Sequence, residues 1–333
     1  MWRGPDEPLV DDPVVVVEGS RVAYSGGAGH APSAEQELVG DWFLMPAVVD
    51  HHVHLGLADP RAVLRGGVTA VRDLGWPPDD IFPLVDISQG TDYAGPSVAA
   101  CGPMLTAVGG YPTRQDWAPP GTGLEVRGGE EAVAAVARLA GEDPAAIKVA
   151  LNAEAGPVLT DAELSATCEA AHARGLRVVA HCQGEGQTER ALGAGVDELA
   201  HTPWTEKLSQ RTIQGMVRRG MTIVSTLDIH SYGVASQQLR VAVDNLFRFR
   251  AAGGRVLYGT DLGNGPIPPG IHAREAQHLA MARMEPEEIL RAMTAWSLHP
   301  GARADLVALE GNPLEDLDAL GEVRAVVRSG RVV

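Results

Sequence analysis

The chain has 333 residues, which suits one barrel of about 250 residues with a small additional domain, and 45% of them are hydrophobic. Its formal net charge of -16, with no stripe of basic residues, argues against binding to nucleic acids or to membrane surfaces. Three cysteines without paired spacing, Cys101, Cys168 and Cys182, do not suggest a disulfide framework, so a cytoplasmic location is expected.

Both ends of the chain are rich in strand signals. Residues 13–24 predict a hairpin with a Gly-Ser turn, and residues 304–309 and 323–333 have the same extended character. The sequence therefore predicts a small β-sandwich domain built from both termini, residues 1–45 and 303–333.

Between these ends, over residues 46–302, apolar runs alternate with helical patterns, as in successive βαβ units. The clearest helix begins at Thr160, where a capping box with Glu163 is expected, and ends at Gly175. Helices are expected at residues 160–173, 189–192, 206–219 and 239–252. Strands are expected at residues 48–54, 69–73, 98–101, 146–151, 176–180, 197–200, 221–227 and 255–259. This α/β pattern predicts a (β/α)8 TIM barrel, whose chemistry belongs at the carboxyl ends of its strands.

Four histidines and one aspartate stand where apolar runs end. His52 and His54 are two residues apart, so on a strand both side chains face the same way and can reach one metal ion. His181 and His201 each close a later run and form an imidazole pair for a second ion. Asp261 follows the eighth strand, which adjoins the first in a closed barrel, so it can ligate a metal and accept a proton from bound water.

Lys148 is one of only two lysines and lies in the apolar run Ala-Ile-Lys-Val-Ala-Leu. A desolvated lysine amine can lose its proton and add carbon dioxide, which gives a carbamate with two oxygen ligands, whereas arginine cannot do so. The simpler interpretation is a buried lysine paired with a carboxylate. Together with the histidines and Asp261, a carboxylated Lys148 predicts a bridged site for two divalent metal ions.

Along nearly its whole length the sequence resembles the amidohydrolase superfamily. The residues that match the binuclear pattern of that family in order and strand placement are His52, His54, Lys148, His181, His201 and Asp261. Segments such as Gly-Leu-Arg-Val-Val-Ala-His and Ala-Gly-Val-Asp-Glu-Leu-Ala-His resemble its imidazolonepropionase-like and prolidase-like dipeptidase branch. The resemblance implies two zinc ions and hydroxide attack on an amide, peptide-like or cyclic amide C–N bond of a small molecule. It also implies that Asp261 passes the proton to the departing amine.

Substrate selection is expected from loops beyond the strands, with the candidates Tyr111, Arg114, Trp117, Trp204, His230 and Tyr232. His230 and Tyr232 follow the seventh strand, so we expect them to hydrogen-bond a developing oxyanion. For every one of these candidates, a packing or solvent-facing role explains the sequence equally well.

Two other functions stay open at this point. A mononuclear deaminase from the same superfamily would attack a cyclic amidine and would not need Lys148, and Glu185 weakly matches the glutamate that such enzymes use. A metal-binding barrel without turnover is the alternative from another class, although it would not need Asp261 to handle protons. Assembly into a homo-oligomer is also left open.

Overall fold

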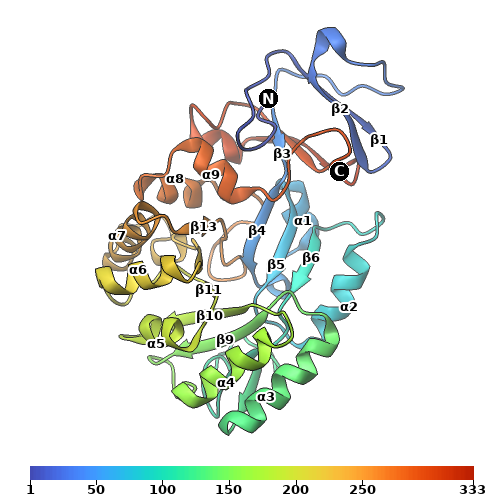
Figure 1. Ribbon diagram of the computed structural model, residues 1–333. Coiled ribbons are helices and arrows are strands. Elements are labelled where there is room, and N and C mark those ends of the chain that lie inside the picture. The colour runs from blue at the N-terminus through green and yellow to red at the C-terminus, as the bar shows by residue number, and fades with distance from the viewer.

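Eight parallel strands form the barrel wall in the computed structural model, which describes residues 1–333 (Figure 1). The strands are β4 (Val48–Val53), β5 (Val68–Asp73), β6 (Ser97–Ala100), β9 (Ile147–Asn152), β10 (Val178–Gln183), β11 (Glu198–Leu199), β12 (Thr222–Val224) and β13 (Arg255–Leu257). β4 to β6 pair in one sheet and β9 to β13 in another, all in parallel. Each overlaps a predicted strand, and the predicted (β/α)8 barrel is confirmed.

Backbone hydrogen bonds join these two sheets at two seams. Beyond β4 and β13, the His54 N–H donates to the Leu262 carbonyl at 2.7 Å. Between β6 and β9, the Ala145 N–H donates to the Ala100 carbonyl at 2.8 Å. The barrel is therefore closed, and its first strand lies beside its eighth.

A buried carboxylate reinforces the seam between β4 and β13. Asp50 accepts hydrogen bonds from the backbone N–H groups of His52 and Thr260, at 3.0 and 3.1 Å. The Thr260 hydroxyl donates to the other carboxylate oxygen at 2.5 Å. Burial raises the pKa of Asp50 to about 7, although these hydrogen bonds favour its charged form.

Helices cover the outside of the barrel (Figure 1). They are α1 (Pro60–Arg65), α2 (Pro78–Ser88), α3 (Gly128–Leu139), α4 (Asp161–His172), α5 (Gln187–Ala194), α6 (Gln210–Arg218), α7 (Gln237–Ala251), α8 (Ala273–Met281) and α9 (Pro286–Met293). Short 3-10 helices are η1 (Ala28–His30), η2 (Leu55–Leu57), η3 (Ala140–Glu142), η4 (Asp228–His230) and η5 (Leu317–Gly321). The predicted capping box of Thr160 and Glu163 begins α4. None of the helices has both the length and the apolar character needed to cross a bilayer.

Two strands were not predicted, β7 (Met104–Ala107) and β8 (Gly123–Val126). They pair in parallel, and β7 joins the barrel sheet where Leu105 pairs with Val149 of β9. The segment between β7 and β8 contains Tyr111 and Trp117, so this addition positions two of the aromatic candidates.

The remaining strands lie at one end of the molecule, where both chain termini are found (Figure 1). A hairpin contains β1 (Pro13–Glu18) and β2 (Arg21–Gly27), and an antiparallel sheet contains β3 (Phe43–Pro46), β14 (Leu306–Leu309), β15 (Val323–Arg328) and β16 (Arg331–Val332). Val22 of β2 and Leu306 of β14 share a small buried cluster with Met1 and Leu298. The predicted β-sandwich made from both termini is confirmed, while the boundaries at residues 45 and 303 stay a prediction.

Candidate metal centre

A cavity of about 300 Å³ opens at the carboxyl ends of the barrel strands. Its lining includes the six predicted ligands, His52, His54, Lys148, His181, His201 and Asp261. The sequence placed them on or just after five different strands, and the fold brings them to one cavity.

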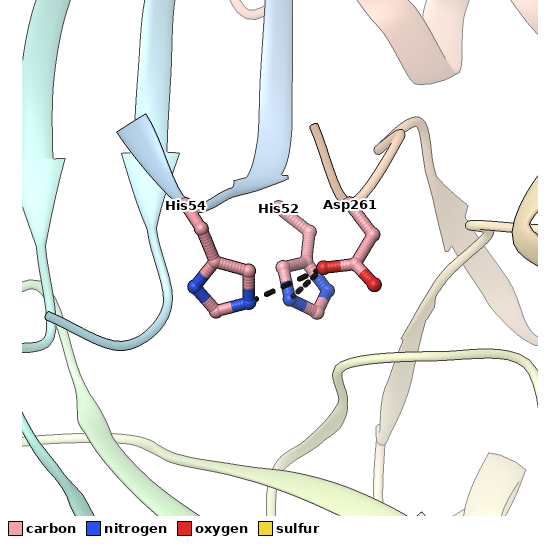
Figure 2. A group of neighbouring side chains, drawn as sticks. All are labelled: His52, His54 and Asp261. Atoms are coloured by element: carbon pink, nitrogen blue, oxygen red, sulfur yellow. Dashed lines mark ion pairs between the residues drawn. The ribbon is translucent and has the colours of Figure 1, made fainter. Parts of the chain in front are cut away.

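His52, His54 and Asp261 form the tightest group, shown in Figure 2. The Nε2 atoms of His52 and His54 lie 3.1 and 3.3 Å from the same Asp261 oxygen, Oδ1. All three side chains are buried, and their ligand atoms lie within 4.8 Å of one another. This spacing fits a single metal ion between them.

Backbone carbonyls orient both imidazoles. His52 Nδ1 lies 2.7 Å from the Ala200 carbonyl, and His54 Nδ1 lies 3.1 Å from the Gly75 carbonyl. Because a carbonyl only accepts, each Nδ1 carries the proton and each Nε2 turns a lone pair toward Asp261. Burial alone would raise the pKa of Asp261, whereas positive charge facing it from the His52, His54 and His201 rings lowers the pKa well below its usual range, and a cation bound at this point would act in the same direction. Two lone pairs and a carboxylate directed at one point repel each other unless a cation lies among them.

A second pair of ring nitrogens lies alongside this group. His181 Nδ1 and His201 Nε2 are 2.9 Å apart, and the ring centroid of His201 is 4.6 Å from that of His52. The other nitrogen of His201, Nδ1, contacts the Thr226 hydroxyl at 2.9 Å. Burial lowers the pKa of His181 to about 3, so its imidazole is neutral at pH 7 and able to ligate a metal.

Lys148 is the second residue of β9 and pairs in register with Val179 of β10, two residues before His181. Its side chain is fully buried, and Nζ has neither a hydrogen-bond partner nor a carboxylate within ion-pair distance. Burial lowers its pKa to about 8. No carboxylate therefore pairs with Lys148, which argues against a simple buried ion pair. Near pH 8 a fraction of the Lys148 amine is neutral and able to react with carbon dioxide.

Whether these residues fit metal ions can be judged from their buried polar atoms that lack hydrogen-bond partners. Those that are buried without a hydrogen bond are His52 Nε2, Lys148 Nζ, His181 Nε2 and Asp261 Oδ1. Each such atom costs about 1–3 kcal/mol when it stays unpaired. Four of them around one cavity are explained together if they ligate cations, so the donor set fits a metal centre.

Aromatic side chains stand around the ligands. Tyr111 stacks on His181 with ring centroids 4.9 Å apart, and Trp204 lies 4.4 Å from His230. Trp117 packs 4.9 Å from the His54 ring. These aromatic candidates and His230 line the cavity.

Two substrate candidates do not line the cavity. Arg114 is exposed, and its guanidinium group lies beside Gly109. Tyr232 is 37% exposed, and its hydroxyl donates to Asn264 Oδ1 at 3.1 Å. Both residues lie in turns between regular elements, whose conformation cannot be deduced from proximity in the sequence.

Some lining residues were missed from the sequence, among them Asn152, Gln183 and Asn264. Asn264 Nδ2 donates to Asp261 Oδ2 at 2.8 Å and orients that carboxylate. Asn152 and Gln183 end β9 and β10, so following those strands to their last residues would have found them. Asn264 lies in a loop, and the only sequence signal that could have found it is its position three residues after Asp261.

With this geometry in place, comparisons with known proteins identify the family. The Amidohydrolase family model matches residues 43–333, and the chain belongs to the amidohydrolase family. It is a metal-dependent hydrolase that acts on carbon–nitrogen bonds, as the sequence predicted. An uncharacterized protein of Mycobacterium tuberculosis is 27% identical over 360 residues, which cover 98% of this chain and 93% of that protein.

Solved structures show the same fold. The crystal structure of a Xaa-Pro dipeptidase with methionine bound in its active site has a TM-score of 0.80 at 21% identity, covering 96% of this chain and 94% of that chain. The crystal structure of Aspergillus niger ochratoxinase also has a TM-score of 0.80 at 21% identity, covering 99% and 93%. In sequence, ochratoxinase is 28% identical over 191 residues, 49% of this chain and 38% of that protein.

Proposed function

We propose that this amidohydrolase is binuclear and cleaves an amide, peptide-like or cyclic amide C–N bond in a small molecule. The proposed ligands are His52, His54 and Asp261 for one ion, His181 and His201 for the other, and carboxylated Lys148 for both. The observation that supports the proposal is the set of buried, unpaired ligand atoms around one cavity. Imidazole and carboxylate donors suit zinc, which we propose as the metal.

Carboxylation of Lys148 follows from its surroundings. The neutral amine attacks carbon dioxide, an N–C bond forms, and the amine proton leaves to solvent. The product is a carbamate with one negative charge, and its two oxygens can each ligate an ion. The unmodified Lys148 amine is buried without a hydrogen-bond partner, whereas the carbamate oxygens would have the two metal ions as partners.

The chain's own residues then handle the proton and the carbonyl. When bound, two divalent ions lower the pKa of a water molecule and polarise the scissile carbonyl. Asp261, oriented by Asn264, accepts the proton of the attacking water and returns it to the nitrogen as the C–N bond breaks. His230 Nε2 is buried without a partner, so a neutral His230 is able to donate a hydrogen bond to the developing oxyanion.

The two alternatives have less support. Glu185, which a deaminase would need beside the substrate, is exposed and does not line the cavity. A deaminase would also leave the buried Lys148 amine unexplained. A barrel without turnover is disfavoured by membership in a family of hydrolases.

Three further features of the chain are part of the proposal. All three cysteines are free and buried, which fits a cytoplasmic location. The cavity volume fits a small-molecule substrate. The terminal sheets support a division into residues 1–45 with 303–333 and a barrel of residues 46–302.

The test compares the two lysines of the chain. Lys148→Ala removes the proposed bridge, whereas Lys207→Ala removes an exposed lysine, 70% accessible, and serves as the matched control. After loading with zinc and bicarbonate, we expect two zinc ions in the wild type and in Lys207→Ala by elemental analysis. We expect at most one in Lys148→Ala, with turnover lower by about hundredfold or more.

Intact-mass measurement under non-denaturing conditions should also show the mass of one added carbon dioxide in the wild type and not in Lys148→Ala. A single zinc ion per wild-type chain, together with full turnover in Lys148→Ala, would instead support a mononuclear enzyme.

A further inference from the structure

The lining of the metal cavity is nearly free of charge outside the proposed ligands. Lys148 and Asp261 are its only lysine, arginine, aspartate or glutamate side chains, and both belong to the proposed metal centre. A substrate in this cavity therefore meets neither a cationic side chain nor a carboxylate that is available for binding.

The amide side chains of the lining are already paired within the protein. Asn152 Nδ2 donates to Gln183 Oε1 at 2.8 Å, and Gln183 Nε2 donates to Glu154 at 2.7 Å. Asn264 holds Asp261 at 2.8 Å. These groups have little capacity left to solvate a charged substrate.

Two nearby arginines, Arg114 of a loop and Arg274 of α8, do not supply the missing charge. Arg274 donates to both oxygens of Asp228, at 2.8 and 2.7 Å, and neither it nor the exposed Arg114 lines the cavity. His230 does line it, but burial lowers its pKa to about 4, which leaves its ring neutral at pH 7. The cavity wall thus has no permanent cation.

Aromatic and aliphatic groups take the place of charges. The Tyr111 ring and the Trp204 ring stand on separate segments, one against His181 and the other against His230. Leu57, from η2, adds an aliphatic surface to the same lining. Such walls favour a planar, uncharged group and oppose a carboxylate or ammonium, which must be paired when it is desolvated.

From this lining we infer that the substrate is a neutral aromatic amide, with neither a free carboxylate nor a free ammonium group beside the scissile bond. The inference rests on the proposed hydrolytic function and narrows it: an unblocked dipeptide brings both charges, and the cavity offers neither of them a partner. Carboxylates also have affinity for metal ions, so any discrimination against them must come from the protein wall.

The test uses two compounds that share the same scissile bond, N-benzoylphenylalanine and N-benzoylphenylalaninamide. With zinc-loaded wild-type enzyme, we expect kcat/KM for the neutral amide to exceed that for the acid by at least about tenfold. Equal values, or a preference for the acid, would overturn the inference while leaving the hydrolytic function intact.

A variant tests whether the absence of charge on the cavity wall causes the preference for the neutral amide. Leu57 is 42% exposed, so Leu57→Arg can add a cation to the lining at little cost to folding, and Leu57→Gln is the neutral control. We expect Leu57→Arg to shift the ratio of kcat/KM toward the acid by about tenfold relative to Leu57→Gln. Identical ratios in the two variants would show that the charge of the wall does not select the substrate, contrary to the inference.

Absence of turnover for both compounds would count against the proposed function and not against the inferred selectivity. Calorimetric titration of the same zinc-loaded enzyme then compares the two Kd values directly. At least about tenfold tighter binding of the amide supports the inference, and equal or tighter binding of the acid overturns it.

Discussion

Burial, more than residue type, sets the behaviour of the side chains in the cavity. Burial lowers the pKa of Lys148 to about 8 and that of His181 to about 3. Asp261 is equally buried, yet positive charge facing it, from the His52 and His54 rings or from a cation bound between them, keeps its pKa low. A carboxylate that stays ionised beside imidazole nitrogens is the arrangement that both metal binding and proton transfer need.

His230 provides a test at the scale of one residue. We expect His230→Ala to lower kcat by about hundredfold, because a donor to the developing oxyanion is lost. The exposed His30 supplies the control variant His30→Ala. Steady-state kinetics with a hydrolysed substrate is the measurement, and a kcat within twofold of the wild type would exclude this role.

The histidine and aspartate ligands could be proposed from the sequence because each stands at the end of an apolar run, whereas Lys148 could be proposed because it is a lysine inside such a run. His181 and His201 are examples in which the local pattern alone gives the position. Neighbours from distant segments could not be found in this way. The contact of Asn264 with Asp261, and the outward placement of Arg114, depend on loop conformations that no periodic pattern encodes.

Among the secondary-structure elements, η4 and α8 are linked by two buried acids. Glu275 of α8 accepts the backbone N–H groups of Leu227 and Asp228, both at 2.8 Å. Asp228 of η4 in turn accepts hydrogen bonds from His272 and Arg274. Because His230 belongs to η4, this anchor fixes the backbone that carries it into the cavity.

Replacing Asp228 with asparagine should loosen this anchor. Burial alone would raise the pKa of Asp228, but hydrogen bonds from His272, His278 and Arg274 outweigh it and hold the pKa well below its usual range. We expect Asp228→Asn to lower the free energy of unfolding by about 3 kcal/mol, a low value for a buried pair because Arg274 is partly exposed. Denaturant titration measures the change.

The pH dependence of this difference has a definite sign. A carboxyl whose pKa is lowered on folding contributes stability above its unfolded value of about 3.9 and loses it as the pH falls below that value. The difference in the free energy of unfolding between wild type and Asp228→Asn should thus be constant from pH 5 to 8 and become smaller in acid. A gap that widened in acid would contradict the assignment.

Sequence periodicity predicted the eight barrel strands and the helices α4 to α7, but not α1, α2, α3, α8 or α9, nor the inserted strands β7 and β8. The eight barrel strands are apolar runs flanked by turn signals, and the Thr160 capping box gave the start of α4. Gly109 and Gly110 follow β7 and Gly123 begins β8, so glycines interrupt the apolar pattern around both strands. β7 pairs with β9 and β8 pairs with β7, and this pairing is a property of the assembled barrel.

At the scale of the whole molecule, metal ions should stabilise the fold. The ligand set exists only in the folded chain, so each bound ion adds about 2.7 kcal/mol when its free concentration is a hundred times Kd. We expect chelation to lower Tm by several degrees and zinc to restore it, as followed by calorimetry. Lys148→Ala should show a smaller drop because it binds fewer ions, and a Tm unaffected by chelation would argue against the metal centre.

The position of the seam between β4 and β13 has a consequence for how the molecule opens. His52 belongs to β4 and His54 follows it directly, whereas Asp261 follows β13, so an ion held by all three would connect the first and last strands across the seam of the barrel. Transient parting of these two strands would have to release the ion first. Zinc should therefore slow amide hydrogen exchange most at the backbone N–H groups of His54 and Asp261, which bridge the seam.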